Sequence, residues 1–233
     1  MNVDNERKQR ICHSLKVQEA LSATCGCCAR LLVSGLLLAA CFSGCALVDK
    51  PSRPMVYDFG PGAPGAPVAK AADSLGVLAL SEVEADSALD DKAVLYRLVY
   101  TDAQQLLPYA QARWSMAPAQ LVRQRLREVL GLRRTVLSPG DGNLTGSKPV
   151  MVLRVQLEEF SQLFDAPGQS SGLVRLRATL VQGSPGGDRL LGQRSFAVQR
   201  PAPTPDARGG VRALTAATDT AVEEIEQWLM QFP

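Results

Sequence analysis

The chain has 233 residues with 25 lysines and arginines against 23 acidic residues, and residues 1–45 hold five of the basic and three of the acidic side chains. The remaining sequence carries 20 of each sign, a neutral balance that lacks the basic footprint of a nucleic-acid-binding domain. All six cysteines and the single histidine also lie at or before Cys45, so the sequence beyond it offers no disulfide, no Cys/His metal site and no histidine for acid–base catalysis; we expect no cofactor.

An apolar run near the N-terminus has the pattern of a secretory signal. Residues 31–45 follow Arg30 and end in small residues and cysteines, as the charged, apolar and exit regions of such a signal do. Two endings match the lipobox of bacterial lipoproteins, whose cysteine is acylated: Leu-Ala-Ala before Cys41 and Phe-Ser-Gly before Cys45. The alternative is an uncleaved membrane helix, because residues 31–48 contain no charge over 18 residues, the lower limit for a span.

The prolines and glycines after Cys45 predict an extended segment. Five prolines and three glycines fall within residues 51–67, a density that neither a helix nor a central strand accommodates. We therefore predict three regions: a lipoprotein signal peptide with a long polar leader over residues 1–45, a flexible tether over 46–73, and a single folded domain over 74–233.

The first half of this domain contains two predicted strands and one helix. Apolar runs over residues 74–80 and 94–100 have strand length and are separated by the turn-forming Asp90 and Asp91. A helix should follow residues 107–114, with Ser115 as its N-cap, Pro118 in its first turn and Gly131 at its end. Its buried stripe is formed by Leu121, Val122, Leu126, Val129 and Leu130. Residues 132–137 after it are a candidate for a further short strand.

The second half predicts an antiparallel meander and a last helix. Three runs beginning at Met151, Val174 and Leu190 alternate apolar with polar residues, and short turn-forming connectors join them. After a proline-rich break, nine apolar residues recur with a period near 3.6: Val211, Leu214, Ala217, Ala221, Val222, Ile225, Trp228, Leu229 and Phe232. The fold class is therefore α+β, with a mostly antiparallel sheet of about five or six strands and two main helices packed on it.

Several motifs in this order resemble one protein family. They are Gly-Cys-Ala-Leu at 44–47, Tyr-Asp-Phe-Gly at 57–60, Tyr-Arg-Leu at 96–98, and Tyr-Ala-Gln-Ala-Arg-Trp at 109–114 followed by Pro118. Over residues 44–230 the chain resembles the ABC-type transport auxiliary lipoproteins, the lipoprotein component of Mce-type lipid transport systems in Gram-negative bacteria. In that family the lipidated cysteine directly precedes the short linker, which favours Cys45 and leaves Cys41 as the fallback.

The resemblance implies a non-catalytic, lipid-anchored protein of the outer membrane that faces the periplasm. Its expected partners are an Mce-domain substrate-binding protein with its permease and ATPase, and it is compatible with a lipid cargo and with a homo-oligomer. The alternative is a structural or assembly lipoprotein of the envelope without a transport role. A periplasmic hydrolase is disfavoured, because the sequence after Cys45 has no histidine to act as a base, no nucleotide-binding loop and no Ser-x-x-Lys pair.

The block over residues 109–114 supplies the candidate contact residues. Aromatic residues make up only 5% of the chain, yet Tyr109 and Trp114 lie within six residues of each other and beside Arg113. Tyr, Trp and Arg dominate binding hot spots, so these three side chains are candidates for contact with the partner or a lipid chain. The competing interpretation is structural: Trp114 packs beneath the first helix and Arg113 caps or pairs nearby.

Overall fold

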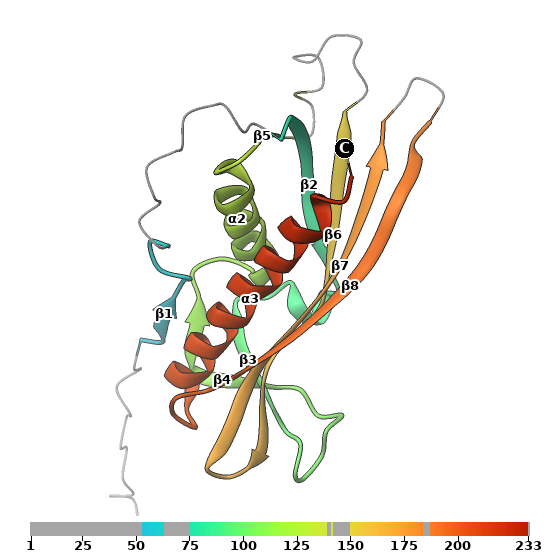
Figure 1. The fold of residues 1–233 in the computed structure, drawn as a ribbon. Coiled ribbons are helices and arrows are strands. Elements are labelled where there is room, and N and C mark those ends of the chain that lie inside the picture. The colour runs from blue at the N-terminus through green and yellow to red at the C-terminus, as the bar shows by residue number, and fades with distance from the viewer. Residues whose placement is uncertain (1–52, 63–74, 139–140, 142–149, 184–186, 233) are drawn as a thin grey trace, which may run out of the picture. The chain divides into compact units, whose positions relative to one another are not determined.

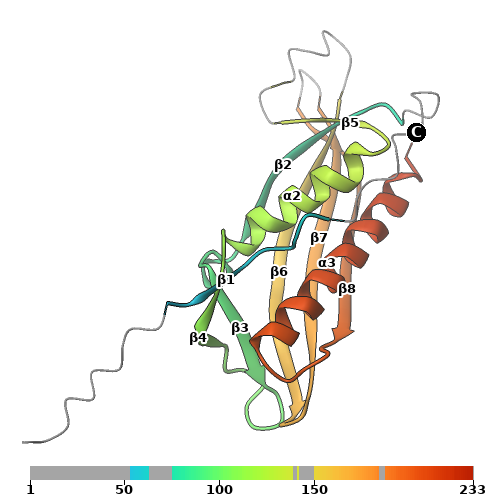
Figure 2. The same ribbon diagram turned by 90° about the vertical axis from the view of Figure 1, so that its left-hand side faces the viewer.

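The computed structural model describes residues 53–62, 75–138, 141, 150–183 and 187–232, all of which belong to the compact unit formed by residues 52–233. Two long helices lie on one face of an eight-stranded sheet (Figures 1 and 2). The elements are β1 Met55–Tyr57, β2 Val77–Ala85, the 3-10 helix η2 Ser87–Leu89, β3 Ala93–Leu98, β4 Leu107–Trp114, α2 Pro118–Gly131, β5 Thr135–Leu137, β6 Met151–Ala166, β7 Gln169–Gln182, β8 Arg189–Pro201 and α3 Ala207–Leu229.

Strand β6 organises the sheet. Along its whole length it pairs antiparallel with β7, which in turn pairs antiparallel with β8, so the predicted meander is confirmed. The other edge of β6 is shared: β2 pairs in parallel with its first half and β3 with its last residues, Gln162–Phe164. Beyond β3 follow β4 and then β1, and beyond β2 lies β5.

The sheet is mixed, which corrects the expectation of a mostly antiparallel one. Strands β2 and β3 follow one another along the same edge of β6, and both run parallel to it; β1–β4 and β2–β5 are parallel pairs as well. The two strands beyond the predicted six are β1 and β4. Short connectors reveal antiparallel neighbours, whereas a parallel pair such as Leu78 and Met151 joins residues far apart in sequence and leaves no local sign.

Helix α3 buries the apolar stripe that its sequence predicts. Eight of the nine residues are buried, and Phe232, beyond the helix, is partly buried against the core. The helix begins after Asp206, whose side chain accepts a hydrogen bond from the Gly209 backbone nitrogen. Close packing on β7 requires a glycine, because a Cβ at Gly172 would lie 2.6 Å from the backbone nitrogen of Leu214.

Helix α2 differs from its prediction at the first turn. Its N-cap is Ala117, without a side-chain cap bond, because Pro118 occupies the first helical position. Ser115 is therefore not the N-cap; its backbone nitrogen instead donates to the Tyr57 carbonyl at 2.7 Å. The predicted end of the helix at Gly131 is confirmed, and of the predicted stripe only Val129 is less than fully buried.

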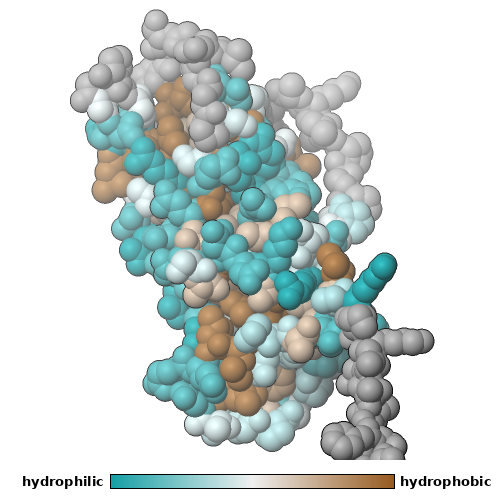
Figure 3. All heavy atoms as spheres, turned by 180° about the vertical axis from the view of Figure 1, so that it is seen from behind, coloured by the Kyte–Doolittle hydropathy of each residue, from teal (hydrophilic) through white to brown (hydrophobic). Residues whose placement is uncertain are grey.

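The sheet face turned away from the helices is mainly hydrophilic across its middle, with hydrophobic areas toward the ends (Figure 3). Exposed residues of β7 and β8 contribute to this face, among them Arg175, Arg177, Gln193 and Ser195. The two faces thus have different chemistry, and the apolar core of the described residues lies between the sheet and the two helices.

Candidate functional site

The first candidate feature is strand β4, which carries the predicted contact residues Tyr109, Arg113 and Trp114. A pronounced bulge shapes it: Ala93 of β3 lies opposite Arg113 and Leu95 opposite Pro108, so a step of two residues on β3 spans five on β4. In a regular strand, Tyr109 and Trp114 would point to opposite faces. The bulge turns both toward the helix-covered face.

Trp114 lies in the core rather than at the surface. It is 1% exposed, and its ring meets Phe160 of β6 at 5.5 Å and Phe59 at 5.7 Å, both in edge-to-face geometry. Phe59 belongs to the segment that follows β1, so Trp114 joins that segment to the central strand. This position matches the packing interpretation of Trp114 and leaves its side chain no route to a partner at the surface of this fold.

Tyr109 is half-buried and held by polar contacts. Its hydroxyl donates to the Gln162 side-chain oxygen at 2.9 Å, and its ring lies 4.6 Å from that of Tyr96. Gln162 is fully buried and donates in turn to Ser170 at 2.8 Å. Burial, reinforced by Tyr96 and Asp206, raises the pKa of Tyr109 above its usual value, so the phenol stays protonated and remains a donor.

Arg113 is exposed, and it lies beside Val56 of β1 in the sheet register. The structure therefore separates the three predicted contact residues: Trp114 is enclosed, Tyr109 lies at the margin of the core, and Arg113 reaches solvent.

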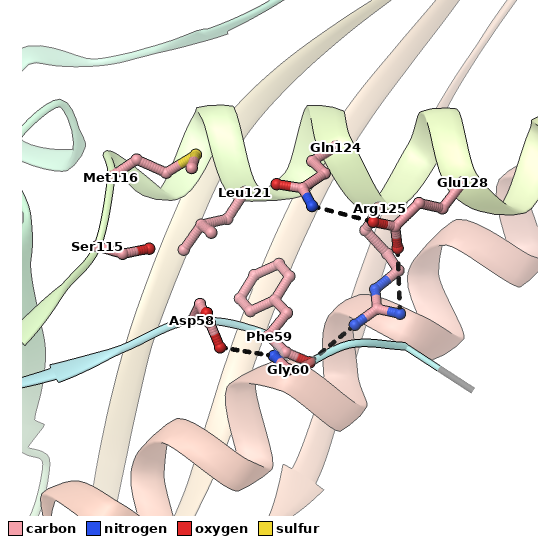
Figure 4. Close-up of a pocket in the computed structure, with 9 residues that line it drawn as sticks. All are labelled: Asp58, Phe59, Gly60, Ser115, Met116, Leu121, Gln124, Arg125 and Glu128. Carbon is pink, nitrogen blue, oxygen red and sulfur yellow. Dashed lines mark hydrogen bonds and ion pairs between the residues drawn. The ribbon is translucent and has the colours of Figure 1, made fainter. Parts of the chain in front are cut away.

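The second feature was missed by the sequence analysis: a buried arginine on α2. The side chain of Arg125 is 8% exposed and joins three parts of the chain. It donates to the Phe59 carbonyl at 2.9 Å and lies 3.4 Å from Glu128 (Figure 4). Its guanidinium also lies 3.2 Å from the Asp219 carboxylate of α3. The sequence did contain a sign of this buried arginine: Arg125 lies one turn after Leu121, within the apolar stripe of α2, and a charged side chain at such a position needs buried partners.

These contacts hold residues 58–60 between α2 and α3, where the chain runs after β1 (Figures 2 and 4). The contact between Arg125 and Asp219 is an ion pair without hydrogen-bond geometry. Burial raises the pKa of Asp219, and the Arg125 charge acts against this rise. We call the group formed by Phe59, Trp114, Arg125 and Asp219 the α2–α3 joint.

A cavity of about 70 Å³ adjoins the joint and is lined by Asp58, Phe59, Ser115, Met116, Leu121 and Gln124, among others (Figure 4). This volume holds a few water molecules and is far smaller than the roughly 300–1,000 Å³ of ligand pockets. The joint is therefore a structural connection between the N-terminal segment and the helices, and the cavity is not a lipid site.

A family model for the ABC-type transport auxiliary lipoprotein component matches residues 57–226. The chain belongs to this family. The matched range begins at Tyr57, so the segment held by the α2–α3 joint is part of the family domain of this auxiliary lipoprotein.

Solved structures share the fold of this auxiliary lipoprotein. A crystal structure of a DUF330 protein from Xanthomonas campestris is 16% identical, with 76% of this chain and 95% of that chain covered and a TM-score of 0.60. A crystal structure of an uncharacterised protein is 15% identical, with 76% and 99% covered and a TM-score of 0.53. At these identities the likeness concerns the fold. No curated protein sequence matches the chain.

The described part of the auxiliary lipoprotein contains neither a metal-binding group of three or more His, Cys, Asp or Glu residues nor a helix long and apolar enough to cross a bilayer. Cys41, Cys45 and the apolar run over residues 31–48 lie outside the described residues. The predicted tether does include described residues: 53–62 form β1 and the segment in the joint, so the folded domain begins earlier than predicted.

Proposed function

We propose that this auxiliary lipoprotein is a non-catalytic, periplasm-facing component of the outer membrane that serves an Mce-type transport system for lipids or other hydrophobic molecules. The observation that carries the proposal is the family match, which begins at Tyr57, shortly after the predicted lipidation motif that ends at Cys45. The largely hydrophilic sheet face supports a role in docking and assembly rather than in enclosing a lipid. Two larger hollows, of about 360 and 340 Å³, are lined mainly by charged and polar residues such as Glu82, Arg123 and Arg154, which do not suit an acyl chain.

The lipid anchor is the first part of the proposal to test. Anchoring that lasts requires more than one acyl chain, since each buried CH₂ contributes about 0.8 kcal/mol. Ala46 rather than Asp follows Cys45, so the retention signal of enterobacterial inner-membrane lipoproteins is not present after this cysteine.

A Cys45→Ser variant should lose incorporation of a fatty-acid analogue, and the matched Cys41→Ser variant should keep it. Both proteins are expressed at full length in a Gram-negative host, labelled during growth and compared by in-gel detection. Membrane fractionation of the protein without either substitution should place it in the outer membrane. Undiminished labelling of Cys45→Ser together with loss in Cys41→Ser would move the anchor to Cys41.

The transport assignment is tested by association. We expect the tagged full-length chain to co-purify with the Mce-domain protein when it is co-expressed with the permease, ATPase and Mce-domain protein of the same genome. The control is an unrelated outer-membrane lipoprotein with the same tag. A chain that is lipidated, located in the outer membrane and folded, yet captures none of the three components, would favour the structural envelope lipoprotein instead.

A further inference from the structure

Strand β1 is the first described element after the predicted lipid anchor, and the fold holds it firmly. It pairs with β4 in register from Met55 to Tyr57, and the Tyr57 carbonyl accepts the Ser115 backbone N–H. The next residues are fixed by the Phe59 ring against Trp114 and by the Phe59 carbonyl on Arg125. Because β1 is fixed to the rest of the fold in this way, its orientation relative to a membrane also sets that of the whole described domain.

The length of chain before β1 limits its distance from the membrane. Residues 46–52 are all that separates Cys45 from Arg53, and at about 3.5 Å per residue this stretch spans at most about 28 Å. Strand β6 alone has 16 residues and extends over roughly 50 Å at about 3.3 Å per residue. One part of the domain, the part around β1, is thus kept near the lipid headgroups.

The surface at β1 carries apolar and basic side chains, the kinds that favour a position at the lipid headgroups. Met55 is 48% and Val56 66% exposed, and among the described strands β1 pairs only with β4, so it forms an edge of the sheet. Large aliphatic side chains on an exposed edge invite association unless something covers them. Arg113 lies beside Val56, and Arg53 lies two residues before Met55; both are exposed and suit lipid phosphates.

We propose that the β1 edge, with Val56 and Arg113 on one side of the sheet, Met55 on the other and Arg53 just before the strand, rests edge-on on the phospholipid headgroups of the membrane that holds the anchor. We call these four residues the β1 surface. The inference rests on the lipid anchor of the proposed function. Because the anchor already holds the domain at the bilayer, the effective concentration is high and a small surface suffices. Aliphatic groups enter the interface, while the two guanidinium groups bind phosphate oxygens.

The other end of the sheet then points away from the membrane. Leu190, at the start of β8, pairs with Val181, which pairs with Val152 near the start of β6. The β3–β4–β1 side of the sheet instead joins β6 at Gln162–Phe164. Leu190 is 63% exposed, close to the exposure of Val56, and so provides a matched control position.

The test labels a single cysteine in the lipidated full-length protein. No cysteine follows Cys45, so Val56→Cys and Leu190→Cys each add one reactive thiol to the anchored chain, and the parent protein measures any background. Each labelled protein is reconstituted into phosphatidylethanolamine–phosphatidylglycerol vesicles in which a fraction of the lipids carries a headgroup quencher. We expect loss of fluorescence for the label at 56 and none for the label at 190, and Arg113→Glu should restore the fluorescence at 56.

The other outcomes overturn the inference. Equal quenching at both positions, or quenching only at 190, would contradict the proposed orientation. A label at 56 that escapes the lipid quencher but shows energy transfer between copies would assign the β1 edge to a second copy of this chain. Flotation separates these results from a failure of the anchor: protein that does not float with the vesicles refutes the anchor, whereas protein that floats without quenching at 56 refutes only the β1 surface.

Discussion

Replacing Trp114 by alanine should lower the free energy of unfolding by about 3–5 kcal/mol, the range for truncating a buried aromatic side chain. Trp114 is 1% exposed, and the change would leave a cavity between β4, β6 and the segment after β1. It would also remove the edge-to-face contacts with Phe59 and Phe160, so the loss would extend to the docking of the N-terminal segment.

The measurement is a urea titration and a melting curve of residues 46–233, with Arg113→Ala as the matched control. Arg113 is the adjacent residue on the same strand, but it is exposed and so should change stability by less than about 0.5 kcal/mol. Together the two variants distinguish a packing role of residues 109–114, tested by Trp114→Ala, from the role of an exposed side chain, tested by Arg113→Ala. A Trp114→Ala protein that melts like the unmodified chain would contradict the structural role of this residue.

The elements predicted well from the sequence are those whose burial leaves a local periodicity. The α3 stripe repeats with the helical period, and buried and exposed residues alternate along most of β7, in the first half of β6 and around Phe196 and Val198 of β8, because each strand presents one face to the same core. These patterns need no knowledge of distant partners. The same reasoning located α2, although Pro118 moved its N-cap from Ser115 to Ala117.

The elements missed are those defined by distant partners. Strand β4 contains Pro108 and a bulge that places Tyr109 and Trp114 on one face despite their odd spacing, so its alternation is broken. Strand β1 has three residues between proline- and glycine-rich stretches and is a strand only because β4 lies beside it. Truncation at residue 74, where the predicted tether ends, would therefore remove Phe59 and expose Trp114.

Replacing Arg125 by methionine should lower the free energy of unfolding by about 2–3 kcal/mol at neutral pH, because the Phe59 carbonyl loses a charged donor and Asp219 loses its ion-pair partner. The matched control is Arg123→Met, the same change two residues earlier on α2. Arg123 pairs at 2.9 Å with Glu82, whose side chain is 70% exposed, and such pairs contribute about 0–1 kcal/mol.

The pH dependence of the Arg125→Met effect identifies the role of Asp219. Burial raises the pKa of Asp219 in the folded state, Glu223 and Glu128 add to the rise, and Arg125 opposes it. A carboxyl with a raised folded pKa costs stability once pH exceeds its unfolded pKa, and the cost grows until pH passes the folded value. Removing Arg125 raises that folded pKa further, so the deficit of the variant should be smallest at acidic pH and grow as pH rises toward neutrality. Adding Asp219→Asn to Arg125→Met should abolish this growth; a deficit that is the same at every pH would show that Arg125 acts through the Phe59 carbonyl alone.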